Sequence, residues 1–204
     1  MRGCFPLPPD CHFDTSRSAL PSSVRITTLA AVVYLSLTAI ALVWAWLGYG
    51  RQAWELDAAW LTHPYPTRLL VSLALGLLLG LAVVATTRLL VAHAQWAREL
   101  QRELRAIVGD LSPRELTWLA LLSGFAEELF FRGAMQPVLG LWLTSLIFGV
   151  VHVGPRRVFL AWSLWAFVMG VLLGAIFELT GVLWGAVLAH VWINQRNMRF
   201  IQRY

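Results

Sequence analysis

Residues 113–138, PRELTWLALLSGFAEELFFRGAMQPV, form an apolar run of membrane-spanning length that carries two adjacent glutamates and an arginine near its middle. Each charge inside such a helix costs about 2.5–3.5 kcal/mol, so charges persist there only when they are paired, line a cavity or have a function. Glu128 and Arg132 share one helix face and can form an ion pair. Glu127 points about 100° away from Glu128, so it needs a different explanation.

The composition places this segment in a membrane protein. Hydrophobic residues make up 58% of the 204 residues and charged residues 13%, whereas soluble domains have about 45–50% and about 25%. This excludes a disordered protein, a coiled coil and an ordinary cytosolic enzyme. We predict an all-α, polytopic membrane helical bundle with about six transmembrane helices, at residues 26–46, 69–92, 113–138, 141–153, 158–179 and 182–193. The fourth and sixth runs are short for a span of about 20 residues.

The remaining segments define four regions along the chain. Residues 1–25 are polar and rich in proline and serine, which predicts a flexible tail in which Cys4 and Cys11 match no zinc or disulfide pattern. Apolar residues at helical spacing within 93–111 predict an amphipathic helix on the membrane surface or a solvated connector helix. We expect the tail (1–25), two spans with the amphipathic helix (26–111), a catalytic helical core (112–196) and a basic C-terminus (197–204).

The distribution of arginines predicts the orientation. All 16 basic residues are arginine, and six spans place 13 of them on the side of the two termini and only Arg51 and Arg68 on the other. Because positive residues favour the cytoplasmic side, both termini are predicted to be cytoplasmic. The arginines lie in short gaps between spans rather than on one solvated face, so we expect no nucleic-acid partner.

Three further polar residues lie at membrane depth. At about 1.5 Å per residue, Glu127 lies about 18 Å, His152 about 16 Å and His190 about 12 Å into a hydrocarbon core about 30 Å thick. Asn194 follows His190 by one turn and shares its face. A lone histidine could simply make a packing hydrogen bond between helices, and the Glu128–Arg132 pair could be an assembly device. Their common depth predicts one intramembrane site instead.

The three motifs Glu-Glu-x-x-x-Arg, Phe-x-x-x-His and His-x-x-x-Asn, each on a separate hydrophobic helix, resemble those of the CPBP intramembrane proteases. This superfamily includes CAAX prenyl endopeptidases and bacterial proteins of the Abi group. The resemblance covers residues 112–196. It implies an endopeptidase that cleaves a membrane-associated protein or peptide, with six site residues: Glu127, Glu128, Arg132, His152, His190 and Asn194.

The resemblance also implies roles for these residues. Glu127 would activate a water molecule that His152 helps to hold, and the histidine and asparagine of the third motif would stabilise the oxyanion. Glu128 and Arg132 would hold the helix and orient Glu127. This glutamic mechanism needs no cofactor. A zinc site of Glu127, His152 and His190 is the alternative, although the sequence contains no His-Glu-x-x-His motif.

Other functions remain open at this stage. A non-catalytic immunity or scaffold protein could have kept the same fold, and intramembrane Glu and His residues also serve transporters and proton relays. The two halves show no evident inverted repeat, which argues against a transporter. The short chain without lysine is typical of a bacterial inner-membrane protein. The sequence does not identify the substrate.

Overall fold

The computed structural model describes residues 22–57 and 59–203, most of which lie in helices. The elements are α1 (Ser22–Tyr49), α2 (Tyr65–His93), α3 (Gln95–Val108), α4 (Pro113–Glu128), the π-helix η1 (Leu129–Met135), α5 (Gln136–Val150), α6 (Val158–Thr180) and α7 (Trp184–Arg203). The predicted all-α bundle is confirmed. Most of the predicted tail, including Cys4 and Cys11, lies outside the described residues. Because α1 begins at Ser22, residues 22–25 of that tail are helical.

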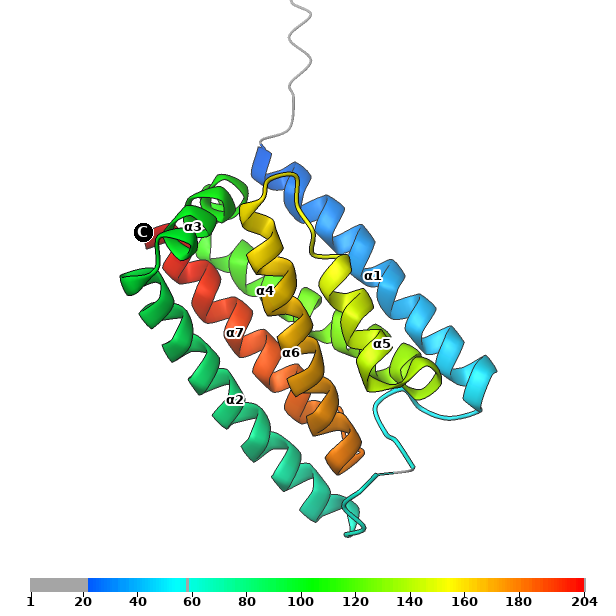
Figure 1. Ribbon diagram of the computed structural model, residues 1–204. Coiled ribbons are helices and arrows are strands. Elements are labelled where there is room, and N and C mark those ends of the chain that lie inside the picture. The colour runs from blue at the N-terminus through cyan, green and yellow to red at the C-terminus, as the bar shows by residue number, and fades with distance from the viewer. Residues whose placement is uncertain (1–21, 58, 204) are drawn as a thin grey trace, which may run out of the picture.

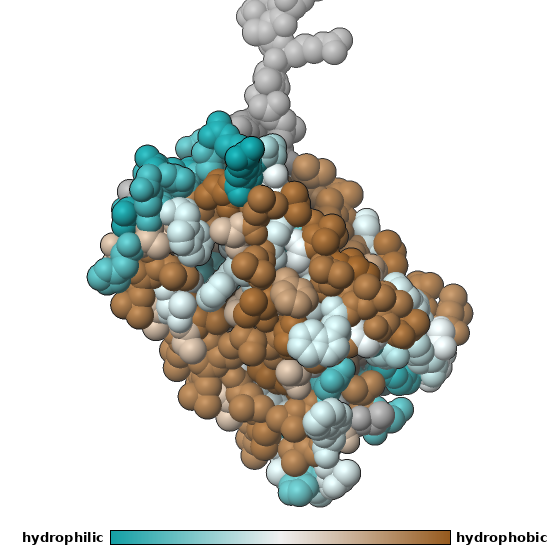
Figure 2. Space-filling view, in the orientation of Figure 1, coloured by the Kyte–Doolittle hydropathy of each residue, from teal (hydrophilic) through white to brown (hydrophobic). Residues whose placement is uncertain are grey.

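The exterior of the bundle is suited to lipid. Figure 2 shows a broad apolar surface between hydrophilic side chains at the two ends of the bundle. Large apolar side chains are exposed along α1, α2, α5 and α6, among them Leu35, Leu78, Leu146 and Leu164. Four helical segments are long and apolar enough to cross a membrane: Ile26–Tyr49, Tyr65–His93, Pro113–Val150 and Val158–Thr180. A water-soluble protein would bury so much apolar surface, so these helices span the bilayer.

The longest of these segments is folded back on itself at Gly140. This residue has φ 73° and ψ 170°, a conformation outside the helical region, and the chain reverses there. The predicted break between residues 138 and 141 is therefore confirmed. The ten residues from 141 to 150 rise only about 15 Å, half the thickness of the hydrocarbon core. A loop then continues from the end of α5 to the start of α6 (Figure 1).

The two ends of the bundle differ. α3 lies across the end at which α7 finishes, which we call the α3 end (Figure 1). At the opposite end, residues 50–57 and 59–64 run along the turn between α6 and α7. There the amide of Leu56 donates to the carbonyl of Gly181 at 2.9 Å, and the amide of Leu183 donates to the carbonyl of Trp54 at 3.1 Å. These bonds tie the first loop to the base of α7.

α3 differs in part from its prediction. Its apolar residues Leu100 and Val108 are buried, and the helix packs on α2, α6 and α7. Trp96 and Ile107 of the same helix remain substantially exposed. The buried apolar residues of α3 therefore cover the end of the bundle and do not face lipid. They are removed from water by packing on apolar side chains of the other helices.

Close packing of α2 on α7 places α7 within the bundle. A Cβ atom at Gly76 of α2 would overlap the carbonyl oxygen of Gly185 on α7. Ser72 supports the same approach, since its hydroxyl donates to the carbonyl of Val182 at 2.8 Å and accepts from the amide of Gly185 at 3.1 Å. α7 also packs on α4. The predicted sixth span thus corresponds to the first half of α7, a helix outside the four segments named above.

Candidate active site

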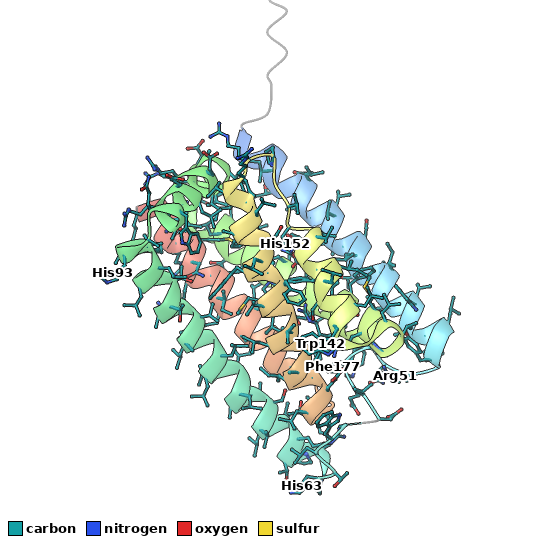
Figure 3. The ribbon with its side chains drawn as sticks, viewed as in Figure 1. Arg51, His63, His93, Trp142, His152 and Phe177 are labelled. Carbon is teal, nitrogen blue, oxygen red and sulfur yellow. The ribbon has the colours of Figure 1, made fainter. Side chains whose placement is uncertain are left out.

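Glu127 lies between two imidazole rings. Its Oε2 atom is 3.9 Å from Nε2 of His152 and 3.8 Å from Nε2 of His190. The three residues come from α4, the loop after α5, and α7, and Figure 3 labels His152 within the bundle. Glu127 is only 9% exposed, and its Oε2 atom has no hydrogen-bond partner among the described residues. The predicted convergence of these three residues is therefore found in the structure.

Glu128 faces the interior and contacts both an arginine and a histidine. Its Oε1 atom accepts a hydrogen bond from Arg132 Nη1 at 2.9 Å and lies 2.6 Å from His190 Nδ1. Glu128 is fully buried and Arg132 is 1% exposed. Arg132 Nη2 also donates to the carbonyl of Gly170 on α6 at 3.3 Å, and the guanidinium lies over the ring of Phe148. The pair therefore holds His190, whereas the resemblance had implied that it orients Glu127.

The helix widens directly after the two glutamates. Residues Leu129–Met135 form the π-helix η1, which contains Arg132. The prediction from sequence was a continuous α-helix here, because no residue pattern distinguishes a π-helix from an α-helix. Short π-helical turns within α-helices are frequent at functional sites. Here the π-helix directly follows Glu127 and Glu128 and contains Arg132, the partner of Glu128.

His152 is held by the end of its own helix. Its Nδ1 atom lies 2.6 Å from the carbonyl oxygen of Phe148, which can only accept, so Nδ1 carries the proton. The neutral ring then has an unprotonated Nε2, and this is the atom that faces Glu127. The rings of His152 and Phe148 also pack with centroids 4.6 Å apart. The spacing Phe-x-x-x-His thus fixes both the tautomer and the orientation of the imidazole.

Asn194 of α7 contacts α4 one helical turn before Glu127. Its Nδ2 atom donates to the hydroxyl of Ser123 at 2.9 Å, and Ser123 precedes Glu127 by one turn on the same face of α4. The sequence analysis did not select Ser123, although its position four residues before Glu127 was a usable signal. It also missed Tyr34 of α1, whose hydroxyl interacts with the Glu127 carboxylate. Tyr34 is one of the few polar side chains in its span, and that was the available signal.

The site opens into a cavity of about 360 Å³ that extends toward the α3 end. Glu127, His152, His190 and Asn194 all line it. The other walls come mainly from apolar side chains of α2, α3 and α6, among them Leu90, Val91, Leu100, Leu104, Trp165 and Met169. A segment that entered this cavity would meet the carboxylate and both imidazoles together.

The spacing of these groups is not that of a zinc site. Ligands about 2.0–2.1 Å from a tetrahedral zinc ion lie about 3.3 Å from each other, whereas the two Nε2–Oε2 separations are 3.9 Å and 3.8 Å. Within residues 22–57 and 59–203, no group of three or more His, Cys, Asp or Glu residues is arranged to hold a metal ion. A zinc ion held by these three residues would require their side chains to move closer together.

Fold and site together define a helical membrane protein with a Glu–His–His cluster buried in its bundle. Residues 111–195 match the Rce1-like family, described as type II CAAX prenyl endopeptidase Rce1-like. This part of the chain is thus similar to a family of CAAX proteases, the similarity that the three motifs indicated.

A curated relative matches a little less than half of the chain. The uncharacterized protein YpbD of Bacillus subtilis (strain 168) is 41% identical over 92 residues, which are 44% of this chain and 47% of that protein. The match therefore covers about half the length of this relative. No solved structure matches the chain significantly.

Proposed function

We propose that the chain is a metal-independent glutamic endopeptidase that hydrolyses a peptide bond in a membrane-associated protein or peptide. The observation that carries this proposal is the environment of Glu127. Its Oε2 atom is buried, has no hydrogen-bond partner in the described part of the chain, and faces two imidazole Nε2 atoms in a mostly apolar cavity. The match to a family of endopeptidases supports the same class of reaction.

The geometry around Glu127 suits the activation of water. The two Nε2–Oε2 separations, 3.9 Å and 3.8 Å, are too long for direct hydrogen bonds, and one water molecule can bridge groups at this spacing. Glu127 removes one proton from this water, and the unprotonated Nε2 of His152 accepts a hydrogen bond from it. The water oxygen attacks the scissile carbonyl carbon and forms a C–O bond. The π electrons of the carbonyl group move to the carbonyl oxygen, which becomes the oxyanion.

The oxyanion that forms then needs hydrogen-bond donors. Asn194 supplies Nδ2, and His190 supplies Nε2–H when the ring is an imidazolium, because its Nδ1 proton is already donated to Glu128. The carboxylates of Glu127 and Glu128 flank that cation. When the intermediate collapses, the C–N bond breaks and Glu127 passes its proton to the leaving amine. The acyl product gains the hydroxyl, so the two products together account for one water.

We further propose that the α3 end faces the cytoplasm. α3 carries Arg98, Arg102 and Arg105, and the last turns of α7 add more arginines at the same end. Positive residues favour the cytoplasmic side of a bilayer. The similarity to a Bacillus subtilis protein supports a bacterial plasma membrane as the location. The partners in this proposal are the lipid bilayer and a membrane-associated protein or peptide substrate.

The decisive experiment compares wild type with Glu127→Gln in lipid nanodiscs. The substrates are internally quenched peptides: one with a prenylated C-terminal cysteine, the same peptide without the lipid, and a set of transmembrane segments. We expect wild type to cleave at least one of them in the presence of a strong zinc chelator. The variant should be about 100- to 10,000-fold slower, because it lacks the general base.

A matched control separates loss of the base from loss of a membrane carboxylate. Glu178 on α6 accepts a hydrogen bond from Gln136 at 3.1 Å and lies outside the cavity lining. Glu178→Gln keeps an acceptor there and should cleave like wild type. Full activity of Glu127→Gln would overturn the site assignment. Activity lost on chelation and restored by zinc would overturn the metal-independent mechanism.

A further inference from the structure

The cavity has a second polar level between the catalytic groups and the α3 end. Residues from His190 to Ile201 line it along one face of α7, a rise of about 16 Å. Asn194 lies near the catalytic end of this face, and Asn197 follows at the next turn. Gln101 of α3 lines the same cavity. These amides are exceptions on walls that are mostly apolar.

Two atoms of this level lack partners. Asn197 Nδ2 donates to the hydroxyl of Thr87 at 3.3 Å, but Asn197 Oδ1 is buried and accepts no hydrogen bond from any described residue. Gln101 is 5% exposed, and its buried Nε2 atom donates to none of them. Buried polar groups are normally hydrogen-bonded, because leaving one unsatisfied carries its full desolvation cost. The orphaned acceptor and the orphaned donor thus belong to two residues that line the same cavity.

This pair of atoms complements a peptide main chain, in which every residue other than proline offers one N–H donor and one C=O acceptor. An extended chain rises about 3.3 Å per residue, so the 16 Å face of α7 corresponds to about five residues. Apolar neighbours such as Leu104 and Met198 provide surfaces for the side chains of such a segment.

We propose that Asn197 and Gln101 form a main-chain binding subsite for the substrate segment that runs from the scissile bond toward the α3 end. Asn197 Oδ1 accepts a hydrogen bond from a substrate N–H, and Gln101 Nε2 donates to a substrate carbonyl. The inference rests on the proposed function in one respect, namely that a polypeptide occupies the cavity. The subsite selects an extended backbone with apolar side chains.

If the subsite exists, removing its amides should weaken substrate binding without lowering the stability of the protein. Asn197→Leu and Gln101→Met replace amides that each have one orphaned atom by apolar groups of similar size. Neither change should therefore lower the unfolding temperature. Thr87 keeps its bond to the carbonyl of Val83 at 2.9 Å when Asn197 is replaced. With a peptide that wild type cleaves, each variant should raise KM about two- to tenfold at nearly unchanged kcat, since one uniformly made hydrogen bond is lost.

Thr144→Val is the matched control. Thr144 on α5 is 1% exposed, and its hydroxyl also lacks a partner in the described ranges. It does not line the cavity. The same kind of change at this position should leave KM unaltered, so an effect confined to Asn197 and Gln101 identifies the cavity rather than any buried polar group.

A binding measurement tests the subsite independently of catalysis. The probe is a dansylated pentapeptide amide of alternating leucine and alanine, with five analogues that each carry one N-methylated main-chain nitrogen. Dissociation constants are measured by fluorescence in nanodiscs on protein with Glu127→Gln, which prevents hydrolysis. We expect at least one analogue to bind about two- to tenfold more weakly than the parent, and Asn197→Leu to remove that difference as in a double-mutant cycle.

The outcomes separate this inference from the proposed function. No measurable binding, no effect of N-methylation, or an effect that persists in both Asn197→Leu and Gln101→Met overturns the subsite. A marked fall in unfolding temperature of both variants also overturns it, because the amides would then support the fold. If N-methylation matters as expected while wild type cleaves no peptide, the subsite stands and the endopeptidase proposal fails.

Discussion

His190 Nδ1 lies 2.6 Å from Glu128 Oε1, and this contact joins α7 to α4 in the interior of the bundle. The two adjacent glutamates therefore have different surroundings, because successive helical residues point about 100° apart. Glu128 faces inward to Arg132 and His190, whereas Glu127 faces the cavity. One carboxylate is paired within the fold, and the other is left available for chemistry.

Breaking the buried ion pair should destabilise the protein severely. Arg132→Met leaves the carboxylate of Glu128 without its cation in a fully buried position. Removing one partner of such a pair costs about 3–5 kcal/mol of unfolding free energy. Equilibrium unfolding in mixed micelles measures this loss.

An exposed ion pair provides the control for that loss. Glu103 on α3 pairs with Arg156, whose side chain is 68% exposed. Glu103→Gln should cost less than about 1 kcal/mol, since solvent screens the pair. Equal effects of Arg132→Met and Glu103→Gln would contradict the structural importance of the buried pair.

The reversal at Gly140 should tolerate no side chain. A Cβ atom there would meet open space, but φ 73° with ψ 170° is a region that L-residues rarely adopt. Gly140→Ala is expected to cost about 1–3 kcal/mol through backbone strain alone. Unfolding measurements should show this loss, and kcat should fall because His152 follows directly after α5. The neighbouring exposed change Leu139→Ala should have a much smaller effect; a Gly140→Ala protein as stable as wild type would refute the argument.

The contact between α2 and α7 should be equally sensitive to a methyl group. Gly76→Ala inserts a Cβ atom against the carbonyl oxygen of Gly185, so the helices must separate. Overpacking of this kind costs about 1–3 kcal/mol. Ala85→Val adds bulk at an exposed position of α2 and serves as the control. Comparable unfolding midpoints for the two variants would show that the close approach contributes little.

Asn194 and Ser123 should separate oxyanion binding from its support. Asn194→Asp removes the Nδ2 donor, so kcat should fall about 100- to 1,000-fold with little change in KM. Ser123→Ala keeps that donor and removes only its 2.9 Å hydrogen bond to the serine hydroxyl, so a smaller loss of kcat is expected. Steady-state kinetics on a cleaved peptide decides between these outcomes. A larger effect of Ser123→Ala would move the role from Asn194 to the serine.

The sequence predicted the common depth of Glu127, His152 and His190 because helical rise converts residue number directly into depth. The start of α4 is also local in origin, because Ser112 and Glu115 form a capping box there. Neither argument could show which residue each glutamate faces. That depends on how α4, α5 and α7 are rotated about their axes, and the rotation follows from packing between helices.

The sequence by itself determined that this chain is a helical membrane protein with charges and imidazoles buried at one depth. Hydrophobic run length and the cost of a charge in hydrocarbon are local properties, so composition and spacing suffice to state them. Only the tertiary structure decided that Glu128 binds His190, that Tyr34 and Ser123 join the site, and that a cavity extends beneath α3. These features arise where residues distant in sequence meet, and close helix packing at positions such as Gly76 fixes which of them do.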